Sequence, residues 1–417
     1  MTLTAKADDS TTFYKLTTNV YGTVNLVNNL TVSNDLTFTK TGSYSGNIIC
    51  PANDCVLTAN GNLTVTGTAG SVYVGNVSTP ANFTIDMTGG TEVSPKSISV
   101  TDNNSWRGHL YASLEISGYV TATQTYGSFG TNNSASIMTI NSGGTFAPGT
   151  GLVSSFYSLT NNGTLAVGTT NFDCNSPFTN SATGTVTSNS GTWYQSANFT
   201  DEGTFNLTSG TFVLDYAGGT SVTLTAKSDG STTFNNLTID SNTSSGSSNL
   251  VNSFTIVGDL NLQRTGGNNN NIACAANNCV ITAQGNVAVT GTSGRVYVGN
   301  VSTPANFTVK MTGGTEVSPK TFTINSNASW GAYLYARLEF EGYTTVNQLS
   351  TSNITFGTNN SESTITVNNG KTMEVGSGVI SNYYSITNNG TVKTGSSNFD
   401  NNSTFTNSAT GTITAGS

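Results

Sequence analysis

Short runs of alternating apolar and small polar residues recur along the chain, about every 8–12 residues. This period of two is typical of half-buried strands. Turn-forming pairs stand between the runs, for example Asn60-Gly61 and Gly89-Gly90. No stretch keeps a helical period over 11 or more residues, so the pattern predicts an all-β fold. Clear examples of the runs are Asn62–Thr66, Asn82–Met87, Thr204–Thr208 and Ser363–Val367.

A large internal repeat organises these runs. The segments Val72–Lys96 and Val296–Lys320 differ only at Ile85/Val309 and Asp86/Lys310, with an offset of 224 positions. The offset is 221 near the start of the chain and 227 after a three-residue insertion in the second copy. The repeat predicts two units in tandem, 1–221 and 222–417, of which the second is shorter at its C-terminal end. Because repeat proteins usually carry capping segments, we expect the chain to be a piece of a longer repeat protein.

Two all-β architectures fit this rhythm, a parallel β-helix and a series of β-sandwich domains. Sandwich domains would show distinct linkers, whereas here the alternation of strands and turns is unbroken. Stacked like charges would repel between coils, whereas Asn, Ser and Thr side chains form hydrogen-bonded ladders. We therefore expect a parallel β-helix (β-solenoid) with coils of about 20–25 residues, and keep tandem β-sandwiches as the alternative.

The composition agrees with stacked coils and excludes several functions. The chain has 54 Asn, 74 Thr, 51 Ser and 46 Gly, so these four residue types make up more than half of its 417 residues. Charged residues make up only 8%, and 13 Lys and Arg stand against 21 Asp and Glu. A nucleic-acid partner is therefore not expected. No run of 18 apolar residues is present, so we expect no membrane insertion by this segment.

The five cysteines indicate an oxidising compartment. Two pairs share the spacing C-x4-C, Cys50 with Cys55 and Cys274 with Cys279, and Cys174 is left over. A zinc site needs four ligands and the chain has a single histidine, so short-loop disulfides are the favoured interpretation and reduced core cysteines the alternative. Disulfides would place the protein outside the cell.

Two sequence segments, Thr233–Ile239 (TFNNLTI) and Phe254–Leu262 (FTIVGDLNL), resemble segments of known proteins. They resemble the repetitive β-helical segments of very large prokaryotic cell-surface proteins. These include adhesins and filament-forming proteins, among them the hook-bearing surface filaments of certain archaea. The resemblance covers nearly the whole chain and implies an extracellular structural or adhesive role. It transfers no functional residue.

The strand around Glu115 and its counterpart around Glu339 contain the candidate contact residues. Alternation predicts that Tyr111 and Glu115 face outward in the first copy, as Tyr335 and Glu339 do in the second. These four residues are candidate contacts for a sugar or a protein partner, and the alternative is an ordinary solvated strand face. The residues predicted to face inward in the first copy are Leu110, Ala112, Leu114 and Ile116.

Catalytic and metal chemistry is not expected. β-Helical polysaccharide-degrading enzymes need grouped carboxylates, and here Asp and Glu are scattered along the chain. We therefore expect no catalytic residue, no metal site and no cofactor, and keep a polysaccharide-degrading enzyme as a remote alternative. Sequons such as those at Asn62, Asn76, Asn82, Asn300 and Asn306 occur about as often as chance predicts and would accept glycans.

Taken together, the sequence predicts a structural protein of the cell surface. We expect a β-solenoid segment of an extracellular filament or stalk, which associates with itself or with neighbouring repeats, or acts as a rigid spacer. The alternative is an adhesin that binds glycans or other cell surfaces.

Overall fold

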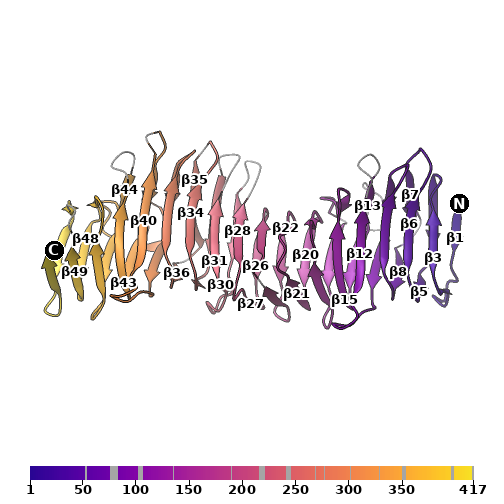
Figure 1. Cartoon of the computed structure of the whole chain (residues 1–417), viewed down its shortest axis with the longest axis horizontal. Coiled ribbons are helices and arrows are strands. Elements are labelled where there is room, and N and C mark those ends of the chain that lie inside the picture. Colours follow the sequence, from indigo (N-terminus) through magenta and orange to yellow (C-terminus); the bar gives the residue numbers. More distant parts are fainter. Residues whose placement is uncertain are drawn as a thin grey trace. The chain divides into compact units, whose positions relative to one another are not determined.

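The computed structural model describes the chain except residues 52–53, 76–82, 102–106, 135, 189, 216–220, 241–245, 268, 277, 301, 328, 350–353, 396–398 and 416–417. Two compact units are present. Unit 1 comprises Met1–Ala197 and Asp201–Phe205. Unit 2 comprises Asn198–Thr200 and Asn206–Ser417. Each unit is built from parallel strands (Figure 1).

In unit 1 each coil contributes three strands, one to each of three parallel faces. One coil consists of β10 (Val72–Val74), β11 (Phe83–Met87) and β12 (Lys96–Thr101). The following coil supplies their partners β13 (Gly108–Leu110), β14 (Ser113–Ile116) and β15 (Tyr119–Gln124), each pairing in parallel. β-Sandwich domains are built from antiparallel sheets. The parallel pairing therefore confirms the β-helix and excludes the sandwich alternative.

Unit 2 has the same construction. Its strand β38 (Val296–Val298) pairs in parallel with β35 (Asn270–Ala276) and β41 (Ala332–Leu334). Its strand β39 (Phe307–Met311) pairs in parallel with β36 (Cys279–Ala283) and β42 (Arg337–Phe340). A short 3-10 helix, η2 (Pro304–Asn306), precedes β39.

The predicted alternation holds along these strands. In β11, Phe83, Ile85 and Met87 are buried and the residues between them are half-buried. Burial of each such side chain contributes about 1.5–3 kcal/mol. Leu110, Ala112, Leu114 and Ile116 also face the interior, as predicted. The core therefore runs through each unit as columns of stacked apolar side chains.

Coil length varies more than the sequence rhythm suggests. Leu110 pairs with Phe129, only 19 positions later. Val74 pairs with Leu110, 36 positions later, because more residues lie between the strands of that coil. The expected range of about 20–25 residues per coil was too narrow. Strands can keep their pairing whatever the corners contain, so corner insertions lengthen a coil without disturbing the ladder.

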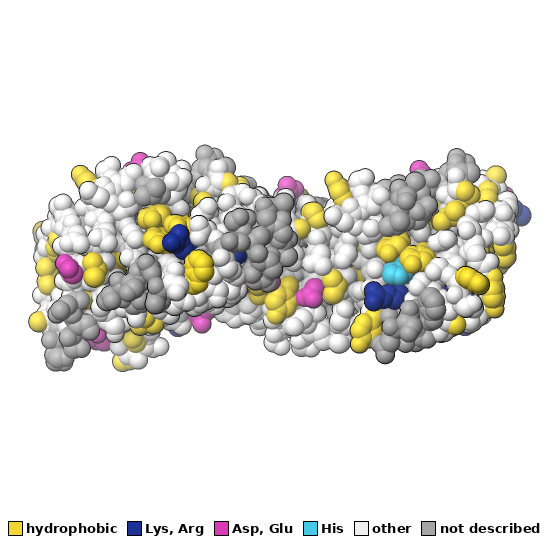
Figure 2. Space-filling view, turned by 90° about the horizontal axis from the view of Figure 1, so that it is seen from above, with side chains coloured by type: hydrophobic (Ala, Val, Ile, Leu, Met, Phe, Trp, Pro, Cys, Tyr) yellow, Lys and Arg dark blue, Asp and Glu magenta, His cyan; other side chains and the backbone are white. Residues whose placement is uncertain are grey.

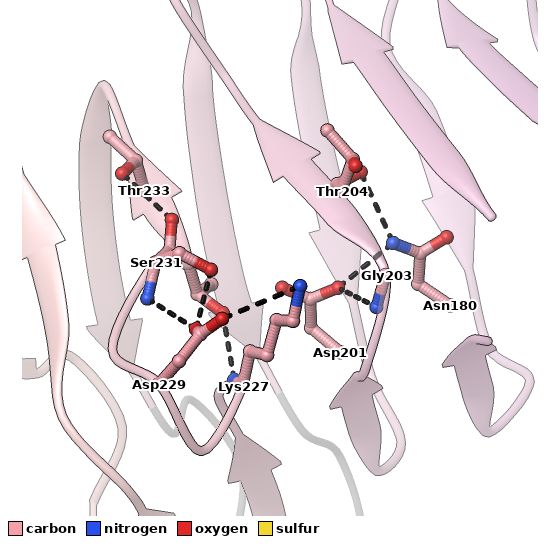
Figure 3. Close-up of polar contacts among 9 residues, drawn as sticks. Asn180, Asp201, Gly203, Thr204, Lys227, Asp229, Ser231 and Thr233 are labelled. Carbon is pink, nitrogen blue, oxygen red and sulfur yellow. Dashed lines mark hydrogen bonds and ion pairs between the residues drawn. The ribbon is translucent and has the colours of Figure 1, made fainter. Parts of the chain in front are cut away.

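Buried polar side chains form a second kind of column in unit 1. Asn161, at the end of β20 (Ser158–Asn161), donates from Nδ2 to Asn180 Oδ1 at 2.8 Å. Asn180, at the end of β23 (Phe178–Asn180), donates to Asp201 Oδ1 at 2.8 Å and to the Thr204 carbonyl oxygen at 3.2 Å (Figure 3). All three ladder side chains are buried. The hydrogen bonds satisfy groups that would otherwise be costly to bury, and they link one coil to the next.

Glycine lines the corner beside this ladder. A Cβ atom on Gly203 would lie 2.3 Å from the carbonyl oxygen of Gly184, so only glycine allows the coils to approach this closely. Asp201 Oδ1 also accepts a hydrogen bond from the Gly203 amide at 3.1 Å (Figure 3). The Asn and Gly residues that are abundant in the sequence therefore have defined places at a coil corner.

Both predicted cysteine pairs are disulfides in the structure. Cys50 bonds to Cys55 with a Cα–Cα distance of 6.0 Å, and Cys274 bonds to Cys279 with a distance of 5.9 Å. Cys174 is a buried free thiol. Two disulfides indicate an oxidising, extracellular environment. Across the described residues, no helix is long and apolar enough to cross a membrane.

Candidate functional site

An outward-facing group of aromatic rings lies on unit 1. Tyr73 of β10 and His109 of β13 are register partners, and their rings stack at 4.6 Å between centroids with an interplanar angle of 4°. The Tyr111 ring lies 5.9 Å from Tyr73 and 5.4 Å from His109. His109 Nδ1 lies 3.1 Å from Ser128 Oγ and 3.3 Å from the Tyr111 hydroxyl oxygen. Burial raises the pKa of Tyr111 further above physiological pH, where an ordinary tyrosine is already a neutral phenol.

Unit 2 carries the equivalent group. Tyr297 and Tyr333 are register partners on β38 and β41, and their rings stack at 4.6 Å with an interplanar angle of 11°. Tyr335 lies 6.4 Å from Tyr333. Burial raises the pKa of Tyr335, and the neighbouring tyrosines add to this effect. We call Tyr73, His109 and Tyr111 the first aromatic group, and Tyr297, Tyr333 and Tyr335 the second.

The stacking follows from strand spacing. Parallel neighbours lie about 4.8 Å apart, close to the separation of two stacked rings, so aromatic residues at the same register position meet face to face. In the space-filling view the histidine lies among hydrophobic side chains, with Lys or Arg side chains alongside (Figure 2). Each aromatic group is therefore a rigid, partly exposed surface.

A cavity of about 350 Å³ adjoins the second aromatic group. Tyr297 and Tyr335 form part of its wall, and Ala273 and Gly299 contribute small residues. Three uncharged polar side chains complete the lining, from Ser247, Asn271 and Asn300.

The predicted contact residues do not all lie together. Tyr111 belongs to the first aromatic group, whereas Glu115 lies on β14 and lines a different cavity of about 360 Å³ together with Ser113, Ile137 and Thr139. Tyr335 lines the cavity of the second aromatic group, and Glu339 lies on β42. The tyrosines and the glutamates are therefore parts of different surfaces.

The surroundings of the two glutamates differ between the repeats. In unit 1, Glu115 is the register partner of Asp86, and Ser117 Oγ donates to Asp86 Oδ1 at 2.8 Å. Burial raises the pKa of Asp86, and the charge of Glu115 raises it further. In unit 2 a cation replaces that aspartate: Lys310 Nζ lies 3.5 Å from Glu339 and 3.1 Å from Glu341.

Each unit also carries a small hairpin. Antiparallel bridges join Thr91 to Ser94 in unit 1 and Thr315 to Ser318 in unit 2. Val93 and Val317, within these hairpins, are almost fully exposed. In unit 2, Lys393 Nζ donates to Glu316 of the hairpin at 2.8 Å and to the Tyr343 hydroxyl at 3.0 Å.

Sequence reasoning missed Tyr73, His109, Tyr297 and Tyr333. A signal was present, since Val-Tyr-Val occurs in both copies and its alternation places the tyrosine outward. The partners of these tyrosines lie 36 positions further on, and the sequence alone did not show which coil they join. The sequons at Asn76 and Asn82 lie outside the described residues.

Comparisons with protein-family models, curated proteins and solved structures found no match. Within the part of the chain that the structure describes, no three His, Cys, Asp or Glu side chains are grouped so that they could hold a metal ion.

Proposed function

We propose that this chain is a structural segment of an extracellular filament or stalk, in which it associates with other copies or with neighbouring repeats of the same protein. The observation that carries the proposal is the register of the coils. Apolar side chains, buried asparagines and backbone groups each bond or pack from one coil to the next. Such stacking resists bending of a unit, which is what a structural segment requires.

The surface chemistry supports association between copies. Only 8% of residues are charged, so copies can approach one another without strong electrostatic repulsion. The two repeats also display closely similar groups, including an aromatic group and an exposed valine in each unit. The disulfides support an extracellular location, and placement at a cell surface is part of the proposal.

Negative-stain electron microscopy over a concentration series tests this function. We expect ordered filaments or bundles of uniform width. Dispersed particles at every concentration would overturn the association between copies. A sample unfolded in urea distinguishes ordered assembly from aggregation of unfolded chains, because assembly needs the folded units.

The second candidate function is adhesion, and the partly exposed aromatic groups favour it. Tyrosine rings held rigidly at a surface offer contact area at a low cost in conformational entropy. In this function the chain would bind glycans or other cell surfaces. Binding of the purified protein to a glycan array or to whole cells tests it, and the absence of binding to both would exclude it.

A further inference from the structure

The cavity beside Tyr297 and Tyr335 has the composition of a ligand site. Ligand sites are concave and combine aromatic walls with a few well-placed polar groups. This cavity measures about 350 Å³, within the usual range for small ligands. We propose that it binds a neutral pyranose residue of a glycan, which makes the adhesive function specific to unit 2.

The aromatic wall favours a sugar ring. Tyr297 is held on one face by Tyr333, which stacks on it at 4.6 Å. On its other side along the ladder, its register partner is Asn271, whose side chain is exposed. The tyrosine ring is therefore fixed before any ligand arrives, so little rotamer entropy is lost on binding. The C–H groups on one face of a pyranose pack against such a ring.

The polar lining favours a neutral ligand. Asn271 and Ser247 supply an amide and a hydroxyl group that both donate and accept hydrogen bonds, as sugar hydroxyl groups do. Asn300 Oδ1 already accepts from the Ser302 amide at 2.9 Å, so this side chain contributes the donors of its Nδ2. The cavity is lined by no charged side chain among the described residues. A phosphate or carboxylate ligand would lose its hydration there without gaining an opposite charge.

Small residues leave the space open. Gly299 has a positive φ of 84°, a conformation that other residues rarely adopt. The adjoining Ala273 corresponds to Ile49 in the first repeat at the offset of 224. Isoleucine at this position would project three further carbon atoms from the strand beside the tyrosines. The first repeat is therefore a natural comparison, with the same tyrosines and less room.

The test uses the whole chain produced in bacteria, so that the sequon at Asn300 carries no glycan. An array of neutral and sialylated oligosaccharides is screened first. The best neutral binder is then titrated as its methyl glycoside, with saturation-transfer NMR as the readout. Preferential binding of sialylated glycans, or no binding of any neutral glycan, would overturn the proposal.

Variants locate the site. Ala273→Ile copies the first repeat and fills part of the cavity, whereas Tyr335→Ala removes one stacking contact. Each should lower the affinity about tenfold. Tyr335→Phe keeps the ring and should bind nearly as the unchanged protein does. The matched control Tyr111→Ala, in unit 1, should leave binding unaltered. Equal losses for Tyr111→Ala and Tyr335→Ala would contradict a site in unit 2.

Circular dichroism and electron microscopy separate this proposal from the structural role. Ala273→Ile should keep the β-sheet spectrum and the capacity to assemble. If assembly fails in the unchanged protein while the glycan binds, the filament function is wrong and the sugar site stands. If assembly occurs and no neutral glycan binds, the sugar site is wrong.

Discussion

Replacement of Asn180 by alanine removes the centre of the buried ladder in unit 1. The amide loses three hydrogen bonds, one accepted from Asn161 at 2.8 Å and two donated, to Asp201 at 2.8 Å and to the Thr204 carbonyl at 3.2 Å. At about 1 kcal/mol for a neutral hydrogen bond and somewhat more for a carboxyl acceptor, the free energy of unfolding of unit 1 should fall by about 3–4 kcal/mol. Two ladder neighbours keep a bond each, Asn161 to the Thr185 carbonyl and Asp201 to the Gly203 amide, so a larger loss is not expected.

Urea unfolding followed by tryptophan fluorescence measures this change. Trp193 is buried in unit 1 and packs edge-on against Phe178 at 4.9 Å, two residues before Asn180. Replacement of Trp106 and Trp330 by phenylalanine leaves Trp193 as the sole tryptophan reporter.

The second repeat supplies the matched control. Asn407 corresponds to Asn180 at the offset of 227, and it accepts a bond from Asn388 Nδ2 at 2.7 Å and donates to the Gly411 carbonyl at 2.9 Å. Asn407 is exposed, so water replaces its partners when it is lost. We expect Asn407→Ala to cost less than about 1 kcal/mol, measured in unit 2 by hydrogen exchange. Equal losses in the free energy of unfolding for the two variants, or a loss below about 1 kcal/mol for Asn180→Ala, would show that the buried ladder does not stabilise unit 1 as proposed.

Three further predictions concern the cysteines and the acidic pair. Replacing both Cys274 and Cys279 by alanine should lower the free energy of unfolding of unit 2 by about 2 kcal/mol in chemical denaturation, because the disulfide closes a six-residue loop and so lowers the entropy of the unfolded chain. No change would show that the disulfide does not stabilise unit 2. Burial raises the pKa of Cys174 to about 12, so iodoacetamide at pH 8 should alkylate it only in urea; stoichiometric labelling of the folded protein would contradict its burial. Burial and the charge of Glu115 raise the pKa of Asp86 in the folded state, so the folded protein favours the protonated carboxyl. The stability that this protonated carboxyl contributes is lost as the pH rises through the folded-state pKa. Asp86→Asn should therefore raise the melting temperature at pH 7 and lose this advantage below the ordinary aspartate pKa of 3.8; an equal effect at pH 7 and pH 3 would refute the electrostatic cause.

Structural features that depend on residues close together in the sequence were predicted correctly. The alternation Leu110, Ala112, Leu114, Ile116 correctly placed those side chains in the core, because the faces of a strand alternate with every residue. The C-x4-C spacing correctly indicated two short disulfide loops. The unbroken alternation of strands and turns correctly favoured a β-helix, in which stacking needs no linkers.

Features that depend on which coils meet could not be read from the chain. The stack of Tyr73 on His109 joins residues 36 positions apart, whereas Leu110 and Phe129 are joined over 19. Corner insertions change coil length at little cost, so the spacing between partners is not periodic. The buried asparagines could not be predicted either. Asparagine usually forms turns, and Asn180 becomes a core residue only because Asn161 and Asp201 form hydrogen bonds with its amide. The cavity in unit 2 depends in the same way on Ala273, whose role appears only beside Tyr297 and Tyr335.

Electron microscopy of the purified chain at increasing concentration tests the proposed structural role most directly. We expect ordered filaments or bundles of uniform width, formed by the folded protein and absent from a sample unfolded in urea. Electron diffraction from aligned assemblies should also show the spacing of about 4.8 Å between neighbouring strands. Dispersed single particles at every concentration would contradict the proposed self-association of the chain.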